Sequence, residues 1–191
     1  MRRRPAKILR PGELRTLLKA AGRARHPERN TVIVLLSVRA GLRACEIASL
    51  EWGMVLTPKR QINHVIELPD WAAKKGSGRR VPVHRELKVA LARLAATEGQ
   101  DGPIVVSERG RSMTARTIVN WFARMYALCD LAGCSSHSGR RTFITNAARL
   151  VYRAGGSLRD VQQLAGHQSL KTTQAYIDGD TDAQRRLVRL L

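Results

Sequence analysis

The sequence predicts a mostly helical α+β fold, a single domain with a small antiparallel β-sheet. Over most of the 191 residues, apolar side chains recur at helical spacing. One central stretch, residues 53–83, is instead punctuated by proline and glycine and contains two short segments typical of strands. The sequence has no internal repeat and no linker. A chain of this length can bury one ordinary hydrophobic core.

The first half of the chain is expected to form three helices and then two strands. Pro11 is suited to the first turn of an amphipathic helix that ends near Gly22. The next segment is almost wholly apolar, which predicts a buried helix, and Gly41 ends it. A basic loop with two glycines joins the strands. The predicted ranges are 11–22, 31–40 and 44–50 for the helices, and 62–68 and 80–83 for the strands.

Helical spacing resumes after the strands. Leucines repeat through residues 87–94, and Thr114 is suited to cap the start of the following helix. Further along, Ser157 and Asp160 have the spacing of a capping box. The predicted segments are an extended piece at 104–107 and helices at 87–94, 114–128, 140–153, 158–165, 169–177 and from 181 onward.

The net charge of +19 restricts the function most. The chain has 34 Lys and Arg against 15 Asp and Glu, and a globule this basic repels itself unless a polyanion neutralises it. We therefore expect nucleic acid as the partner. The surplus is spread over several segments, which favours a groove that follows phosphates; a generally solvated basic surface is the alternative. The basic segments are 1–30, 71–93, 109–124 and 137–159.

Membrane and secreted proteins are excluded by other features. No apolar run is long enough to span a bilayer, and no apolar stretch follows the basic start MRRRPAK. The three cysteines, Cys45, Cys129 and Cys134, are odd in number and lack a metal-binding spacing. We expect a reduced, cytoplasmic, nucleoid-associated protein that binds neither metal nor membrane.

Three short motifs contain polar residues that could act on a phosphate. Arg43 follows the end of a buried helix, where an arginine caps the helix or binds an anion. His137 and Arg140 are three residues apart and would project from one helix face. His167 closes a helix, and Tyr176 follows nine residues later. Each motif alone has an ordinary explanation, such as a solvated histidine–arginine pair or a packed tyrosine.

Taken together and in this order, the motifs resemble the catalytic domain of the tyrosine recombinase (phage integrase) family. The resemblance runs from the first helix to Tyr176 and implies the fold of that domain. Together with a lysine-containing stretch between the first two motifs, four separate stretches match in order, so coincidence is a poor explanation. The matching stretches are AGLRACEIASLEW, KKGSGRRVPVH, HSGRRTFITNAA and LAGHQSLKTTQAYID.

The resemblance implies an enzyme that cleaves and rejoins DNA through a 3′-phosphotyrosyl intermediate. Tyr176 would be the nucleophile, and Arg43 and Arg140 would hold the non-bridging oxygens of the scissile phosphate. His137 would exchange a proton with the tyrosine oxygen, and His167 would donate to the phosphate. No metal or other cofactor is implied, because arginines supply the positive charge and the covalent link preserves the bond energy.

The resemblance also implies a lysine and an acidic residue. Counting back from Val81 places the lysine that protonates the departing 5′-oxygen at Lys74, and its neighbour Lys75 is the alternative. Glu46 matches an acidic position of the family and would orient Arg43 or buttress the site. Contacts with the DNA backbone are expected from Arg2, Arg3, Arg4, Lys75, Arg79, Arg80, Arg116 and Arg141.

Two positions depart from the family pattern. Gly139 stands where the family usually has Leu and lowers helix propensity, and Arg141 stands where a second His is common. We expect residues 1–10 to be a basic arm and residues 11–191 to be the catalytic domain. The separate N-terminal core-binding domain of the family is expected to be absent, either because the chain is a truncation or because it is a natural single-domain recombinase.

Three functions remain open at this point. The first is a site-specific recombinase or integrase, a monomer when free and a homo-tetramer on paired DNA sites. The second is a recombinase-derived accessory or regulatory DNA-binding protein with weak catalysis. The third is a type IB topoisomerase, against which the short length and the LAGH motif argue. The apolar residues of 187–191 would dock either on a neighbouring subunit or on their own core.

Overall fold

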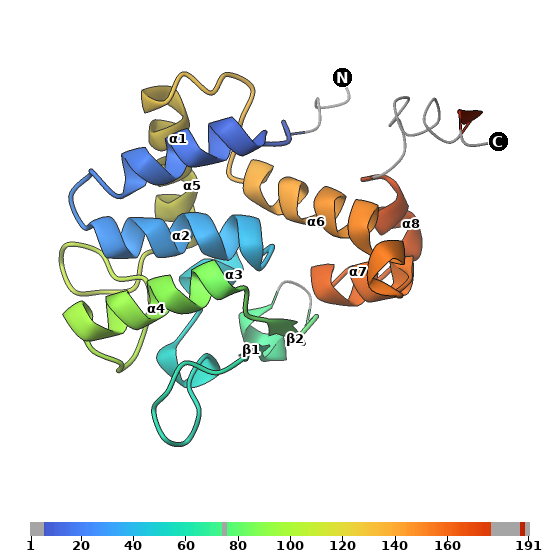
Figure 1. The fold of residues 1–191 in the computed structure, drawn as a ribbon. Helices are drawn as coiled ribbons and strands as arrows, with labels where there is room; N and C mark the ends of the chain where they lie inside the picture. The colour runs from blue at the N-terminus through green and yellow to red at the C-terminus, as the bar shows by residue number, and fades with distance from the viewer. Residues whose placement is uncertain (1–5, 74–75, 177–187, 190–191) are drawn as a thin grey trace.

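Helices make up most of the described chain, and the two strands lie close to the C-terminal helices (Figure 1). The computed structural model describes residues 6–73, 76–176 and 188–189. The predicted class, mostly helical with a small antiparallel sheet, is confirmed. The helices are α1 (Pro11–Ala21), α2 (Pro27–Arg39), α3 (Ala44–Ala48), α4 (Arg85–Glu98), α5 (Ala115–Leu128), α6 (Ser138–Leu150), α7 (Leu158–Ala165) and α8 (Leu170–Gln174); the strands are β1 (Val65–Leu68) and β2 (Arg79–Pro82); the 3-10 turns are η1 (Trp52–Met54), η2 (Asp70–Ala72) and η3 (Tyr152–Ala154).

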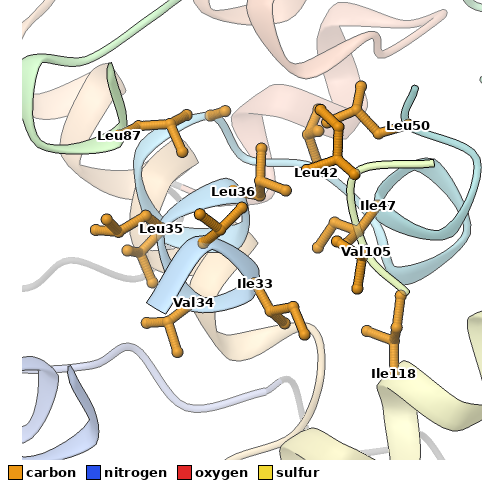
Figure 2. Packing of buried hydrophobic residues seen from close by; sticks show 14 of the residues in the cluster. Ile33, Val34, Leu35, Leu36, Leu42, Ile47, Leu50, Leu87, Val105 and Ile118 are labelled. Atoms are coloured by element: carbon orange, nitrogen blue, oxygen red, sulfur yellow. The ribbon is translucent and has the colours of Figure 1, made fainter. Parts of the chain in front are cut away.

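The larger hydrophobic core is built around α2. This helix is apolar on nearly every face, so it is stable only when other elements surround it, and it packs against α1, α3, α4 and α6. Figure 2 shows Leu87 of α4 on one side of α2, and Ile47, Val105 and Ile118 on the other. All four of these side chains are at most 1% exposed. The predicted buried helix is therefore the centre of the fold.

A second, smaller core holds the C-terminal helices together. It contains Ile144 and Ala148 of α6 and Val161 and Ala165 of α7, with the ring of Tyr176 packed at its edge. Helix α7 also packs against α8 and β2. This small core therefore brings the segments that contain His167 and Tyr176 next to the sheet.

The two strands pair antiparallel, with Val65 opposite Pro82 and Leu68 opposite Arg79. Strand β1 begins three residues later than predicted, because Ile62 forms an isolated bridge with Leu56 instead of joining the ladder. The predicted extended piece at 104–107 also forms only an isolated bridge, between Val106 and Ser112.

Several helix boundaries differ from the predicted ones. Helix α2 begins at Pro27, because His26 adopts a left-handed conformation (φ 64°) that turns the chain into the helix. Helix α6 begins at Ser138, α8 ends at Gln174, and a 3-10 turn covers the end of the range predicted as 140–153. The helix predicted from 181 onward lies outside the described residues except for 188–189.

The described part of the expected N-terminal arm packs against the domain. Leu9 is 4% exposed, and its backbone N–H donates to the hydroxyl of Thr142 in α6 (2.8 Å). The packed structure therefore begins before Pro11, while residues 1–5 lie outside the described part of the chain. Among the described helices, none combines the length and apolar character needed to cross a membrane.

Candidate active site

Arg43 and Glu46 form the start of the site at the N-terminal end of α3. Gly41 (φ 64°) allows the turn out of α2, and a Cβ there would clash with the ring of Phe143. Arg43 then precedes α3, where its backbone N–H donates to Glu46 Oε2 (2.9 Å) and its Nη1 to Oε1 (2.6 Å). The Arg43 side chain keeps 17% of its surface exposed, whereas that of Glu46 has none.

Arg79 is the second partner of Glu46. Its Nη1 and Nη2 donate to the two carboxylate oxygens (3.0 and 2.9 Å), and its Nε donates to the carbonyl of Leu164 (2.9 Å). We expected Arg79 to contact DNA, but its side chain is only 6% exposed, because a fully buried carboxylate requires a paired cation. Arg79 therefore connects β2, α3 and the end of α7.

The carboxyl group of Glu46 remains ionised although it is buried, because these arginines lower its pKa. Burial alone would raise the pKa of the carboxyl group, but the hydrogen bonds and charge of Arg79, together with those of Arg43, lower the pKa to about 2. The group is thus ionised at neutral pH.

Arg140 lies in the first turns of α6 and is 3% exposed. Its Nη1 donates to the carbonyl of Gly41 and its Nη2 to that of Ala165, so one guanidinium joins the end of α2 to the end of α7. Burial and the nearby Arg43 lower the pKa of Arg140 to about 10, which still leaves it charged at neutral pH. Three guanidinium groups therefore surround one carboxylate, and the excess positive charge suits an anion.

His167 follows α7 at the edge of this cluster. Gly166 ends the helix in a left-handed conformation (φ 59°). The backbone of His167 is held by Gln162, whose carbonyl accepts its N–H (3.1 Å) and whose side-chain amide donates to its carbonyl (2.9 Å). Burial, and then the charges of Arg140 and Arg43, lower the pKa of His167 to about 4. The imidazole is therefore neutral at physiological pH.

The ring of Tyr176 contacts both His167 and Arg141. The rings of His167 and Tyr176 stack with centroids 5.4 Å apart, and the Arg141 guanidinium carbon lies 5.6 Å from the centroid of the tyrosine ring. The hydroxyl of Thr145 donates to the backbone carbonyl of Tyr176 (3.4 Å). We expected Arg141 to contact DNA; the structure places its guanidinium against the candidate nucleophile.

The structure thus gathers Arg43, Arg140, His167 and Tyr176 from separate segments. His137 is exposed and directly precedes α6, about one turn before Arg140. Of the predicted DNA contacts, Arg80 and Arg116 are exposed, and Arg80 lies 3.4 Å from Glu67. The predicted residues Lys74, Lys75, Arg2, Arg3 and Arg4 lie outside the described part of the chain.

A cavity of about 360 Å³ adjoins the site. The end of the strand-connecting loop, residues 76–78, forms one wall, and His167, Gln163 and Arg159 are among the residues that line the rest. The loop that contains the predicted lysine therefore continues into this wall. In the described ranges, no cluster of three or more His, Cys, Asp or Glu side chains could hold a metal ion.

Sequence reasoning missed the partners of the site residues. Arg79, Gln162 and Thr173 each hold a predicted residue in place, but none stands at a diagnostic spacing from it. For Arg79, the only available signal was that Glu46 precedes Ile47 on a short apolar helix, so that its carboxylate would need a cation if buried.

The sequence model described as "Phage integrase family" matches residues 7–182. This chain belongs to the phage integrase family. It is 31% identical over 170 residues to the tyrosine recombinase XerC of Nitrobacter winogradskyi. The aligned region covers 85% of this chain and 50% of that protein. The family predicted from the four matching stretches is therefore confirmed.

Solved structures of this family share the fold. The crystal structure of XerA recombinase superposes with a TM-score of 0.76 at 24% identity, covering all of this chain and 65% of that one. A lambda integrase tetramer bound to a Holliday junction superposes with a TM-score of 0.69 at 18% identity, covering 91% of this chain and 48% of that one. This family member spans about half the length of the curated relatives it matches.

Proposed function

We propose that this chain is the catalytic domain of a site-specific DNA recombinase that cleaves and rejoins DNA through a 3′-phosphotyrosyl intermediate. The observation that supports this most directly is the convergence of Arg43, Arg140 and His167 next to Tyr176. Together these residues provide two permanent cations, a neutral hydrogen-bond donor and a nucleophilic hydroxyl. Phosphoryl transfer needs this combination, since its transition state concentrates negative charge on the phosphate oxygens.

In the proposed reaction Tyr176 attacks the scissile phosphate. A bond forms between its hydroxyl oxygen and phosphorus while the bond from phosphorus to the 5′-oxygen breaks. The tyrosine proton passes to His137, and Lys74, or Lys75 in its place, supplies the proton of the free 5′-hydroxyl. Rejoining is the reverse reaction with a new 5′-hydroxyl, so no external energy source is required.

The arginines would stabilise the transition state, each in its own surroundings. Arg43 is partly exposed and free to point a guanidinium edge toward a phosphate, while Arg140 is fixed by two backbone carbonyls. Because Glu46 neutralises only one of the three nearby guanidinium charges, an anion is still attracted. Arg79 would act by holding Glu46 and not by touching DNA.

Double-stranded DNA is the proposed partner, with Arg80 and Arg116 among its contacts, and the protein would act in the cytoplasm. We propose a monomer in the free state and a tetramer on two paired sites. The lambda integrase tetramer on a Holliday junction supports this assembly by analogy of fold. Residues 1–4 would add contacts to the phosphate backbone.

Covalent capture tests the proposal on DNA of any sequence. A pool of duplexes with randomised sequence and a nick, which prevents religation, is incubated with the protein and then denatured. We expect adducts that survive denaturation and whose DNA shares a common site. Tyr176→Phe, which lacks only the hydroxyl, should bind the same DNA without forming an adduct.

The same experiment, together with a plasmid relaxation assay, separates the alternatives. Binding by the wild-type chain without any adduct would support the accessory DNA-binding function in place of the enzyme. Adduct formation by Tyr176→Phe would show that another residue is the nucleophile. Relaxation of supercoiled plasmid without a paired site would indicate a type IB topoisomerase.

A further inference from the structure

The ring of His167 is held by a residue outside the predicted catalytic set. Its Nδ1 lies 3.0 Å from the hydroxyl oxygen of Thr173, which belongs to α8. Thr173 is completely buried, with 0% of its surface exposed. Because Nδ1 is engaged in this contact, Nε2 is the ring nitrogen left for a ligand.

Which nitrogen carries the proton decides what His167 can do. A neutral imidazole has one N–H donor and one lone pair, and the two exchange places between tautomers. Only the tautomer with the proton on Nε2 offers a donor to a phosphate oxygen. With the proton on Nδ1, the lone pair at Nε2 would repel that oxygen.

The surroundings of Thr173 favour one direction of the hydrogen bond. Three other helical threonines, Thr16, Thr97 and Thr142, donate their hydroxyl protons to carbonyls in the preceding turn. Among the described residues, the Thr173 hydroxyl has no hydrogen-bond partner other than His167. A buried O–H that donates to nothing is costly, so the proton of Thr173 belongs on the Nδ1 lone pair.

The surroundings of His167 keep its ring neutral. Burial, and then the charges of Arg140, Arg43 and Arg79, disfavour positive charge on the ring and lower the pKa of His167, which keeps the ring neutral. A neutral ring can still exist in either tautomer, and only one of them donates to an anion from Nε2. A hydroxyl that donates to Nδ1 selects that tautomer.

We infer that Thr173 is a positioning residue that donates its hydroxyl proton to Nδ1 of His167 and thereby keeps Nε2–H available for the phosphate. This inference rests on the proposed function for its consequence, since the phosphate is the proposed ligand. The hydrogen bond itself is a property of the free protein and can be measured without DNA.

Nitrogen-15 NMR of the imidazole rings tests the hydrogen bond directly. In the labelled full-length chain at pH 7.5, the His167 ring is assigned by its loss in His167→Asn. We expect the Nε2–H tautomer in the wild type and in Thr173→Ser, which retains the hydroxyl. Thr173→Val, which removes it at nearly constant volume, should shift the population toward Nδ1–H. An Nδ1–H tautomer in the wild type, or no shift in Thr173→Val, overturns the inference.

Single-turnover cleavage of a captured substrate tests the consequence. Thr173→Val should slow adduct formation by about 10- to 100-fold, with little change in the Kd for DNA, and Thr173→Ser should restore the rate. The control Thr172→Val changes the exposed neighbouring threonine and should behave as the wild type. In a His167→Ala background, Thr173→Val should cause no further loss.

The two readouts distinguish the possible failures. If the wild type cleaves nothing but shows the Nε2–H tautomer, the proposed function fails and the hydrogen bond stands. If Thr173→Val loses activity without a change of tautomer, or if Thr173→Ser does not restore the rate, the role is only structural and the inference is wrong. A thermal unfolding midpoint for each variant identifies any that does not fold.

Discussion

Glu46 is the residue on which the charge of the candidate site depends. Its carboxylate is fully buried and accepts hydrogen bonds from Arg43 on its own helix and from Arg79 on β2. Without it, Arg43, Arg79 and Arg140 would repel one another at short range. A buried pair of this kind is costly to break, because removing one partner leaves an uncompensated charge in the interior.

Replacing the carboxylate of Glu46 should therefore destabilise the fold in a pH-dependent way. The pKa of Glu46 falls from 4.5 to about 2 on folding, so the unfolded chain holds this proton more tightly. The contribution to stability is about 3 kcal/mol above pH 4.5 and is lost as the pH falls toward 2. Denaturant unfolding at pH 7 should show Glu46→Gln less stable than the wild type by about this amount.

At pH 3 the difference in unfolding free energy between the wild type and Glu46→Gln should be less than about half of its value at pH 7. Glu67→Gln is the matched control, because Glu67 is 60% exposed in its contact with Arg80 and should change stability little. An equal loss at pH 3 and pH 7 would show that the carboxylate charge is not the cause.

The two candidate phosphate-binding arginines should respond differently to truncation. The sequence gives no reason to separate them, but Arg140 donates to the carbonyls of Gly41 and Ala165, whereas Arg43 is partly exposed. Arg140→Ala should cost about 2–5 kcal/mol of stability, because two buried carbonyls lose their donors. Arg43→Ala should cost clearly less.

Both variants should reduce cleavage by at least about 100-fold, since each removes a donor to the developing charge on the phosphate. Unfolding curves and single-turnover cleavage, measured on the same preparations, check the two parts separately. Near wild-type cleavage by a folded Arg43→Ala variant would remove Arg43 from the phosphate site.

At the scale of elements, the close contact of α6 with α2 explains a residue that departs from the family pattern. Gly139 lowers helix propensity, yet it lies in the first turn of α6. A Cβ at this position would clash with the Ser37 hydroxyl of α2 and lie 2.9 Å from the Ser37 Cβ. Helix α6 can therefore approach α2 only because position 139 has no side chain, and this approach carries Arg140 to Gly41.

Gly139→Ala should consequently destabilise the protein although alanine is the better helix former. We expect a loss of about 1–3 kcal/mol from overpacking. Gly12→Ala in α1 is the control, because its Cβ would meet no atom closer than 3.8 Å, and it should stabilise by about 0.5–1 kcal/mol. Thermal unfolding of the two variants measures both effects, and a stabilised Gly139→Ala variant would contradict the packing argument.

The spacing of apolar residues predicted the helices well where a single apolar face packs against the core. The range 11–22 and the capping box at Ser157 correspond closely to α1 and the start of α7. Leu128 continues the apolar spacing of Ile118 and Met125 but is 70% exposed, because it is the last residue of α5. Boundaries such as Pro27 depend on a left-handed residue, for which His26 gives no signal.

The sequence predicted the motif residues of the candidate site but not the contacts that hold them in place. Arg43, Arg140, His167 and Tyr176 could be named because their order matches a family, and the structure brings them together. Their supporting contacts could not be named, because hydrogen bonds such as Arg79 to Glu46, 33 residues apart, follow from tertiary packing and not from spacing.

At the scale of the whole molecule, the net charge overstates the number of basic side chains that are exposed for contact with DNA. Arg29, Arg79 and Arg140 belong to the basic segments, but all three point inward. Arg29 is 7% exposed and donates to the carbonyl of Val106 (2.8 Å), so it supports the N-terminal turn of α2. In the proposed function, exposed cations such as Arg80 and Arg116 would bind the phosphates.

The affinity for duplex DNA should therefore fall steeply as the salt concentration rises. Individual exposed residues should each account for a definite part of this salt dependence. Each phosphate contact contributes a slope of about 0.9 to the plot of log Kd against log salt, so several contacts predict a loss on the order of 10³-fold between 50 and 200 mM.

Arg80→Gln and Arg116→Gln should each lower the slope by about one. Arg60→Gln should leave the slope unchanged, because Arg60 lies outside the basic segments. Fluorescence anisotropy over a salt series measures all four proteins, and equal slopes for all of them would mean that the charge acts as a diffuse field and not as a groove of defined contacts.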